Sequence, residues 1–476
     1  MTFDDLPPEV LLIIWECLVM TDEKNFLDKK ASEKLRARMR TTVRFAQITH
    51  RTRAIVLECP TLWREIDLCW PTSAIEHFLT RAQNVGLSIH LDSTKGTRDP
   101  ADAVVEWQTW AAFLKANMPV IQHLFLRIDS TKCSQALSSA LQTPAVNLQT
   151  LTLKMDTLLA LVNIFSSQAP KLRSVNFVTT RCWDLSRFHS ISNVEITVGP
   201  ENCKKTLATL QAMPAILSVI LIGQNKPEDI PQLLPKSTIL RTCRHFKLSK
   251  ILPQGVRCLM LAIRLPSLEK ANISERMVLY DNKLAPTTIT QVLRSVPVVK
   301  LEVASLLIEI EEHSATFEVE GTLNYRYSSR WNDLGKTLPL HDARIYDTVI
   351  NILTLPHRQS KVQPTHLIIR NNISTRAHAT PTAMRMLDFH LLWNQIFTTY
   401  STIEHLELVG YVKDMVETLH QVAEYLPLMA KLEVSHKDLP APALLDALSD
   451  LERDRQLSLR VEQLPNRHAL KSPITS

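Results

Sequence analysis

The sequence predicts an α/β protein. A small all-α segment stands at the N-terminus, and a long series of strand–helix units with an inserted β-meander follows it. Three observations lead to this fold class: apolar residues at helical spacing in 4–18, short apolar x-L-x-L segments that recur after residue 100, and prolines at a constant distance before several of them. One such unit cannot bury both of its faces, so the units should stack into a curved, mostly parallel sheet with helices on its outer face.

The first segment predicts a helix that begins near Asp5. This residue can cap a helix, and the prolines after it fall in the first turn, where a missing N–H costs little. The apolar residues at helical spacing are Val10, Leu11, Ile14, Trp15 and Leu18. Because this set is wider than one helix face needs, one face should pack within the domain and the other against a partner. Residues 43–63 then predict two short helices that end near Pro60.

Together these segments resemble the F-box, whose pattern is Leu-Pro-x-Glu-x-Leu-x-x-Ile, a short helical pair and Pro-x-Leu-Trp. The residues that carry the resemblance are Leu6, Pro7, Glu9, Leu11, Ile14, Leu18, Ile48, Arg53, Pro60, Leu62 and Trp63. The chain is most similar to a fungal set in which Trp-x-x-Ile-Asp-Leu follows, here at 63–68, and then a helix (75–82) and a Leu-x-Ile-x-Leu strand (87–91). One difference is Thr52, which stands where the family usually has tryptophan.

The resemblance implies that the chain binds a Skp-type adaptor and, through it, a cullin. The residues implied to bury against the adaptor are Leu6, Pro7, Glu9, Leu11, Ile14, Trp15, Leu18 and Ile48. A charged insertion at 21–40, with eleven charged residues among its twenty, separates the first helix from the rest. It is either a solvated helix extension or loop, or a basic contact surface formed by Lys34, Arg36, Arg38 and Arg40.

Spacing distinguishes the x-L-x-L segments from chance matches. The twelve segments have their first apolar residues at Leu124, Leu151, Val175, Val194, Val219, Phe246, Leu259, Leu301, Leu367, Leu406, Leu432 and Leu457. The first six are separated by 27, 24, 19, 25 and 27 residues, and the last three by 26 and 25. Pro119, Pro170, Pro214 and Pro427 each lie five residues before such a position, after an apolar helical pattern. The unit is therefore helix, proline turn and strand, which resembles the irregular leucine-rich repeats that follow the F-box in many family members.

Two stretches depart from this period. Phe246 and Leu259 are 13 residues apart, so one of them should belong to a hairpin strand or loop rather than to a repeat. Three alternating segments with short breaks in about 301–331 predict an antiparallel meander. We therefore expect an F-box domain at 1–70, a leucine-rich-repeat-like solenoid at 71–462 and a disordered tail at 463–476.

Histidine precedes the first apolar residue in four of the expected strands, at His123, His245, His366 and His405. In x-L-x-L strands the leucines face the core and the flanking residues face the concave surface. The residues expected to line this surface with the histidines are Phe125, Arg127, Lys247, Arg370 and Glu407. They either form a binding surface for a polar or acidic segment of a substrate protein, or occupy solvated positions that tolerate these residue types.

Composition excludes several other functions. Only eight glycines occur, where average usage predicts roughly 33, and none are close enough to form a dinucleotide-binding loop, a Walker loop or a GxSxG elbow. The turns should therefore use proline stops rather than positive-φ positions. The eight cysteines include no CxxC, and the histidines include no HExxH, so we expect neither a metal nor a cofactor.

The remaining counts concern partners and compartment. The net charge of +6 is small for this length, and no aromatic RNA-binding motif is present, so no nucleic-acid partner is expected. The apolar stretch 10–20 is too short to span a bilayer, so no membrane partner is expected. Scattered cysteines and an acidic start predict a cytoplasmic or nuclear protein.

The sequence favours a non-catalytic substrate-receptor subunit of an SCF-type ubiquitin ligase with an unknown substrate protein. The alternatives are a repeat scaffold outside any ligase and a hydrolase with a triad drawn from distant residues.

Overall fold

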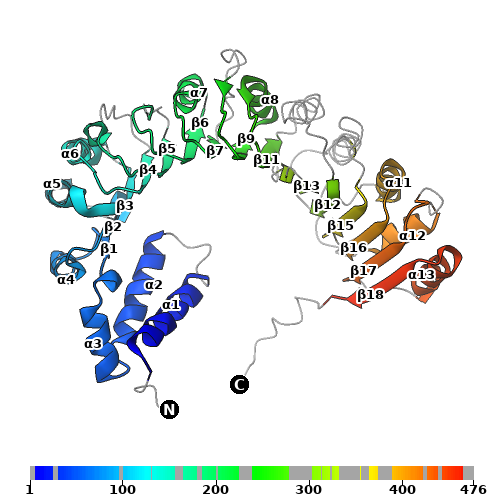
Figure 1. The fold of residues 1–476 in the computed structure, drawn as a ribbon, viewed down its shortest axis with the longest axis horizontal. Coiled ribbons are helices and arrows are strands. Elements are labelled where there is room, and N and C mark those ends of the chain that lie inside the picture. Colours follow the sequence, from blue (N-terminus) through cyan, green and yellow to red (C-terminus); the bar gives the residue numbers. More distant parts are fainter. Residues whose placement is uncertain are drawn as a thin grey trace. The chain divides into compact units, whose positions relative to one another are not determined.

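The chain folds as a mixed α/β protein with a large, mostly parallel sheet (Figure 1). The structure is a computed structural model that describes residues 6–24, 31–95, 100–129, 131–155, 164–179, 185–199, 202–224, 238–277, 303–311, 314–321, 324–331, 354, 364–373, 389–421, 426–437 and 442–464. Eleven α-helices lie within these ranges. The chain divides into two compact units. Unit 1 comprises Met1–Thr197 and Ala212–Ile216, and unit 2 comprises Val198–Gln211 and Leu217–Ser476.

Unit 1 begins with three helices and continues with alternating strands and helices. Its helices are α1 (Pro8–Lys24), α2 (Ala31–Phe45), α3 (His50–Glu58), α4 (Thr72–Ala82), α5 (Pro100–Asn117) and α6 (Thr131–Leu141). Its strands are β1 (Glu65–Asp67), β2 (Leu87–Asp92), β3 (Ile121–Ile128), β4 (Thr150–Met155), β5 (Ser174–Thr179) and β6 (Asn193–Val198). Short 3-10 turns are η2 (Pro60–Leu62), η3 (Ser93–Lys95), η4 (Met118–Val120) and η5 (Ile164–Ser167). The strands pair in chain order, and each of these pairs is parallel.

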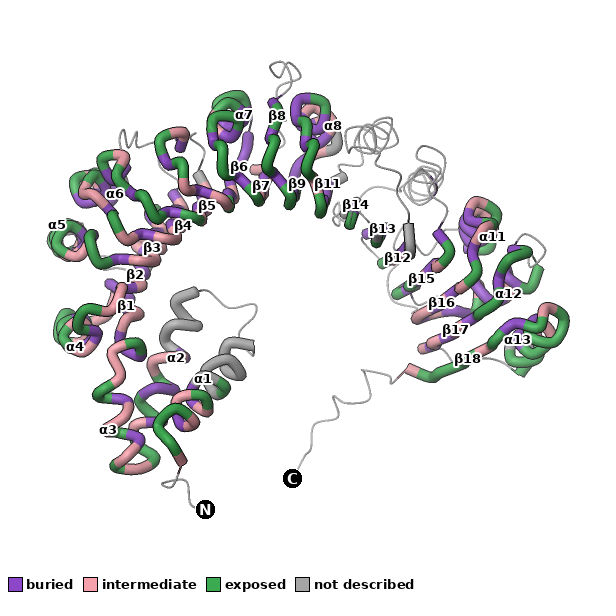
Figure 2. The backbone as a smooth tube through the Cα atoms, viewed as in Figure 1, coloured by how far each residue is buried: buried purple, intermediate pink, exposed green. Residues whose placement is uncertain are grey.

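Alternating burial along the strands produces one covered and one open face of this sheet. In β3, β4 and β5 the leucine-type positions are buried and the residues between them are partly exposed (Figure 2). Helices α4, α5 and α6 lie on the covered side in Figure 1. The open side begins at β1, where α2 lies against the strand: the Arg38 guanidinium and the Glu65 carboxylate are 2.9 Å apart.

Unit 2 continues the strand–helix alternation. Its helices are α7 (Cys203–Gln211), α8 (Pro253–Ala262), α11 (Phe389–Thr399), α12 (Lys413–Gln421) and α13 (Pro442–Arg455). The strands of its large sheet are β7 (Ser218–Gly223), β9 (His245–Ile251), β11 (Lys270–Met277), β12 (Val303–Glu311), β13 (Ser314–Gly321), β14 (Asn324–Trp331), β15 (His366–Asn371), β16 (His405–Gly410), β17 (Lys431–His436) and β18 (Ser458–Gln463). Two short strands, β8 (Thr238–Ile239) and β10 (Ile263–Arg264), pair separately.

The antiparallel meander predicted at about 301–331 is confirmed as β12, β13 and β14, and it enters the sheet in reverse order. The sequence of strands in space is β11-β14-β13-β12-β15. Strand β13 is antiparallel to both of its neighbours, whereas β14 runs parallel to β11 and β12 runs parallel to β15. An up–down–up meander has parallel outer strands, so the insertion preserves the direction of the sheet on both sides.

Most of the expected repeat strands that fall on described residues form, with two exceptions. Leu259 lies in α8 rather than in a hairpin strand or loop, because Val256, Leu259 and Met260 are buried at helical spacing. Leu457 precedes β18, in which Leu459 takes the register position of Leu432. Leu301 lies outside the described residues, two positions before β12. The expected tail also lies outside them, except that Gln463 ends β18 and Leu464 follows it.

Two of the expected proline turns lie between a helix and a strand, whereas the expectation about backbone angles in turns does not hold. Pro119 lies in η4 between α5 and β3, and Pro214 lies in the turn between α7 and β7. The expectation that turns avoid positive φ is wrong, because non-glycine residues between strands adopt it, at Gln83, Phe165, Ser166, Ser167 and Gln456. Lys250 adopts it within β9. Gly410 also has φ +100°, and a Cβ there would lie 2.1 Å from the Asn371 carbonyl oxygen. Over the described ranges, no helix has the length and apolar character that a membrane span requires.

Candidate functional site

The residues implied to bind an adaptor lie on α1, in the segment before it and in the turn after α2. Leu6 and Ile14 are half-buried, Pro7 and Glu9 are exposed, and Ile48 is 53% exposed. The side chain of Leu18 lies outside the described part. The helical segment therefore presents Pro7, Glu9 and Ile48 outward.

Two of the implied contact residues belong instead to the core of unit 1. Leu11 is 0% exposed and Trp15 is 2% exposed. The Trp15 indole N–H donates to the Thr42 hydroxyl over 3.1 Å, and the Arg38 guanidinium lies 5.1 Å from the ring centroid. The expectation that Leu11 and Trp15 would bury against a partner is corrected, because α2 already covers this face of α1.

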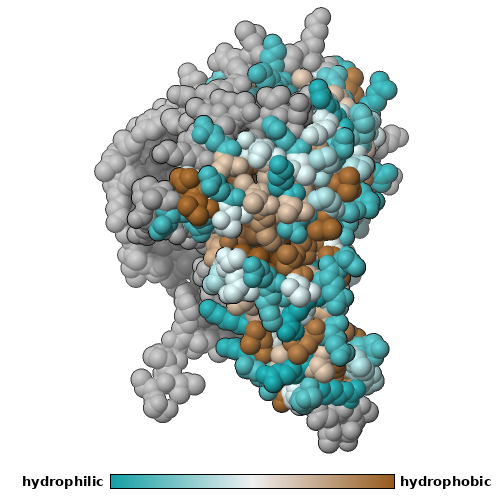
Figure 3. All heavy atoms as spheres, turned by 90° about the vertical axis from the view of Figure 1, so that its left-hand side faces the viewer, coloured by the Kyte–Doolittle hydropathy of each residue, from teal (hydrophilic) through white to brown (hydrophobic). Residues whose placement is uncertain are grey.

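Two apolar residues that the sequence reasoning did not single out are exposed on the same helices. Ile13 on α1 is 58% exposed and Val43 on α2 is 45% exposed. At the lower end of the face drawn in Figure 3, which is the level of α1 to α3 in Figure 1, apolar side chains stand among hydrophilic ones. Exposed isoleucine and valine on helices that already hold a core provide apolar area for a partner.

The charged insertion at 21–40 is largely helical in its described part. Residues 21–24 end α1, and 31–40 form most of α2. Of the expected basic surface, Arg40 is exposed, whereas Arg38 is half-buried between Glu65 and Trp15. The side chains of Lys34 and Arg36 are not described.

Thr52, which stands where the F-box pattern has tryptophan, lies in the first turn of α3. The Thr49 hydroxyl accepts the Thr52 backbone N–H over 3.1 Å, and the Thr52 hydroxyl accepts the Thr49 N–H over 3.0 Å. This reciprocal capping box satisfies two donors at the helix N-terminus. Because Thr52 is 0% exposed, an indole at this position would have to displace the residues that surround it.

On the open face of unit 1, His123, Phe125 and Arg127 alternate along β3 and are all partly exposed, as expected. Burial, followed by the charge of Arg64, lowers the pKa of His123. Phe125 stacks on His90 at 4.3 Å between ring centroids, and Lys154 lies 5.4 Å from the Phe125 ring. The residues of three adjacent strands therefore meet around one aromatic ring.

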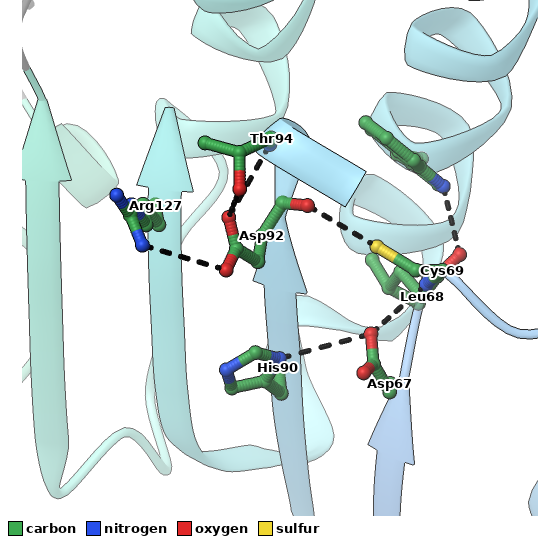
Figure 4. A network of polar contacts seen from close by, with 8 residues as sticks. Asp67, Leu68, Cys69, His90, Asp92, Thr94 and Arg127 are labelled. Atoms are coloured by element: carbon green, nitrogen blue, oxygen red, sulfur yellow. Dashed lines mark hydrogen bonds and ion pairs between the residues drawn. The ribbon is translucent and has the colours of Figure 1, made fainter. Parts of the chain in front are cut away.

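A polar network lies beside this ring, at the ends of β1 and β2 (Figure 4). Asp92 accepts from the Thr94 hydroxyl over 2.6 Å, and its other oxygen lies 3.8 Å from the Arg127 guanidinium. Asp67 accepts from the Cys69 N–H over 3.0 Å, and its Oδ1 lies 3.7 Å from Nδ1 of His90.

The electrostatics of this network favour a binding or structural role. Burial opposes ionisation of Asp67, yet His90 and the Cys69 N–H hold the pKa of that carboxyl below its ordinary value. Burial and the Asp67 charge raise the pKa of the Cys69 thiol to about 12, so this cysteine is a poor nucleophile. The sequence reasoning missed Asp67, His90 and Asp92, because Asp67 on β1 meets the two β2 residues only through the pairing of these strands.

On the open face of unit 2, the expected residues separate into two groups. His245 and Lys247 are exposed on β9. Four strands lie between β9 and β15, which carries His366 and Arg370. His245 is therefore not brought next to His366.

His366 and His405 form a stacked pair, with ring centroids 4.1 Å apart and planes 2° apart. His366 lies 3.9 Å from Glu407, and His405 lies 3.3 Å from Glu433. Within the described residues, Nε2 of each ring has no hydrogen-bond partner. Burial, then His366 and Lys431, lower the pKa of His405, so the His405 ring is disposed to remain uncharged.

The described surfaces thus offer apolar side chains on the N-terminal helices and a mixed aromatic, basic and acidic open face on the strands. These arrangements can bind protein segments, and a thiol like that of Cys69 is unsuited to covalent chemistry. Comparison with known proteins adds no family to this description: no family model matches the chain, and no curated protein matches it significantly.

Proposed function

We propose that this chain is a substrate-receptor subunit of an SCF-type cullin–RING ubiquitin ligase. The N-terminal helices bind a Skp-type adaptor as an F-box does, and the strand–helix units form an irregular leucine-rich-repeat-like solenoid that holds a substrate protein. The chain performs no chemistry itself. It raises the effective concentration of the substrate near a charged ubiquitin carrier, in the cytoplasm or nucleus.

One observation carries this proposal. Helices α1 and α2 pack together with Leu11 and Trp15 buried, yet Ile13, Val43 and Ile48 remain 58%, 45% and 53% exposed. Three exposed apolar side chains on one small helical segment provide apolar area that a partner surface would bury. The revised contact set is therefore Pro7, Glu9, Ile13, Val43 and Ile48, with the half-buried Leu6 and Ile14 at its edge.

The open face supports substrate binding. In unit 1 it carries Phe125 between His90 and Lys154, a grouping that suits an extended segment with aromatic or acidic side chains. In unit 2 it carries the stacked histidines beside Glu407 and Glu433, a grouping that suits hydrogen-bonding side chains.

The test is binding of the purified chain to a purified Skp-type adaptor by calorimetry. Wild type should bind with a micromolar or tighter dissociation constant, and Ile48→Asp and Ile13→Asp should each weaken binding at least tenfold. Leu6→Ala/Pro7→Ala provides a third, milder disruption. Leu261→Asp is the matched control, because Leu261 is an equally exposed apolar residue (61%) on α8.

Circular dichroism spectra of all variants should match the wild type, since the substituted side chains are exposed or half-buried. A wild-type chain that binds no adaptor at micromolar concentration would refute the ligase proposal. Equal weakening by Leu261→Asp would show that the effect is not specific to the N-terminal helices.

A further inference from the structure

Two neighbouring helices of unit 2 bring three metal-ligating side chains together on their solvent side. His390 lies at the start of α11, and Asp414 and Glu417 lie three residues apart on α12. One ligand atom from each of the three residues falls within 4.8 Å of the other two. Nε2 of His390 lies 3.6 Å from Oε2 of Glu417.

A buried threonine orients the imidazole toward the carboxylates. Thr418, which is 2% exposed, donates its hydroxyl hydrogen to the Asp414 carbonyl oxygen over 2.7 Å. That hydroxyl oxygen lies 2.8 Å from His390 Nδ1. Because the hydroxyl hydrogen is already used, Nδ1 acts as the donor, and Nε2 of the neutral ring carries the lone pair. Metal-binding histidines are commonly held in this way, with the non-ligating nitrogen hydrogen-bonded to the protein.

The glutamate is held in a matching way. Lys413 lies 3.7 Å from Oε1 of Glu417, one helical turn away, while Oε2 faces His390. Oε1 of Glu417 is thereby paired with Lys413, and Oε2 is directed at the His390 imidazole. A lone pair on Nε2 facing a carboxylate oxygen is repulsive unless a proton or a cation lies between them. This arrangement calls for a positive charge at the centre of the three residues.

We propose that His390, Asp414 and Glu417 bind a divalent transition-metal ion, with zinc as the best fit. Imidazole nitrogen and carboxylate oxygen are both zinc ligands, and three protein ligands leave a fourth tetrahedral position for water. Ligand atoms of a tetrahedral zinc site lie about 3.3 Å apart, given bond lengths of about 2.0–2.2 Å. The 3.6 Å separation is close to this value, and the half-exposed side chains can close the rest. The ion would join the first turn of α11 to α12, whether or not the chain belongs to a ligase.

The test is calorimetric titration of the chelator-treated, full-length chain with zinc chloride. Other histidines and cysteines can also bind zinc, so the informative quantity is the site that a variant loses. His390→Ala should remove one site or weaken it at least tenfold, and Asp414→Asn should weaken the same site. His420→Ala is the matched control, because His420 is an exposed histidine on α12 outside the cluster. It should retain the full number of sites.

Two further measurements make the outcome decisive. Zinc should raise the thermal midpoint of wild type and His420→Ala more than that of His390→Ala, because the ion binds only the folded helix pair. Millimolar magnesium should not displace the zinc, since magnesium prefers an all-oxygen site. Equal site numbers and affinities in wild type, His390→Ala and Asp414→Asn would overturn the proposal.

Discussion

The phenol of Tyr327 donates a hydrogen bond to the carboxylate of Glu275 in the core of unit 2. The two residues come from the adjacent parallel strands β14 and β11, and they are 0% and 1% exposed. Burial raises the pKa of the Glu275 carboxyl to about 8, and the hydrogen bond from Tyr327 offsets only part of this rise. Within the described ranges, the second carboxylate oxygen has no hydrogen-bond partner. The core therefore contains an acid that is mainly protonated at neutral pH.

This acid predicts a specific pH dependence of stability. Above pH 4.5 the unfolded chain ionises Glu275, whereas the folded chain keeps the proton until about pH 8. The unfolded state thus binds fewer protons in this window, and the contribution of Glu275 to stability falls as the pH rises, then levels off. Glu275→Gln has no such titration. The free energy of unfolding of Glu275→Gln, relative to that of wild type, should therefore rise between pH 4.5 and 8, by at most on the order of 5 kcal/mol.

Urea unfolding followed by circular dichroism at pH values from 4.5 to 9 measures this difference. Glu269→Gln is the control, because Glu269 precedes the same strand and is 54% exposed. Its difference from wild type should remain nearly flat. A difference for Glu275→Gln that does not change with pH would show that the carboxyl ionises normally in the folded chain.

Trp63 connects the N-terminal helices to the first strand–helix unit. Its indole N–H donates to the Val56 carbonyl oxygen of α3 over 2.7 Å, and its ring lies 4.9 Å from Phe78 and 4.8 Å from Arg81, both on α4. Trp63→Ala should cost about 3–5 kcal/mol of stability through the cavity that it leaves. Trp63→Phe should cost less, because a ring still packs against Phe78. Thermal unfolding gives both values, and a cost below about 1 kcal/mol for Trp63→Ala would contradict this linking role.

The regular strands were predictable because their signal is local. Alternating burial follows from the x-L-x-L pattern. The prolines indicate where each strand begins, as Pro119 does before β3 and Pro214 before β7. Strand β11 was not predicted because Glu275 occupies a core position and interrupts the apolar alternation. Leu259 was misassigned for the opposite reason: two apolar residues two positions apart also occur on a helix.

The candidate sites were less predictable because they join distant segments. His366 and His405 were expected on one face, but their stacking depends on the register of β15 against β16. Asp67 and His90 meet only because β1 pairs with β2 in one register. The exposure of Ile13, compared with the burial of Trp15, depends on where α2 packs. A wide apolar pattern along a helix indicates that two of its faces are buried. It does not determine which face packs within the domain and which one contacts a partner.

The capping box at α3 predicts that tryptophan, the residue of the F-box pattern at this position, is unfavourable here. Thr52→Trp would remove the reciprocal bonds with Thr49 and force an indole into a fully buried position. We expect it to destabilise unit 1 by about 2 kcal/mol or more. Thr52→Ser keeps the hydroxyl and should cost about 1 kcal/mol or less. Thermal unfolding of the two variants separates these outcomes, and a stable Thr52→Trp chain would show that α3 can shift to admit the ring.

The stacked histidines predict opposite pKa changes from two neighbouring substitutions. Burial lowers the pKa of His405, and the charges of His366 and Lys431 lower it further, whereas Glu433 raises it. His366→Ala should therefore raise the pKa of His405, because it removes a like charge and opens one ring face to water. Glu433→Gln should lower that pKa, because it removes the carboxylate 3.3 Å from Nε2. The chemical shift of the His405 Cε1 proton, followed by NMR from pH 4.5 to 8, measures both changes. The wild-type midpoint should lie below 6.5. If both substitutions moved the midpoint in the same direction, the stacked arrangement of the two rings beside their carboxylates would be wrong.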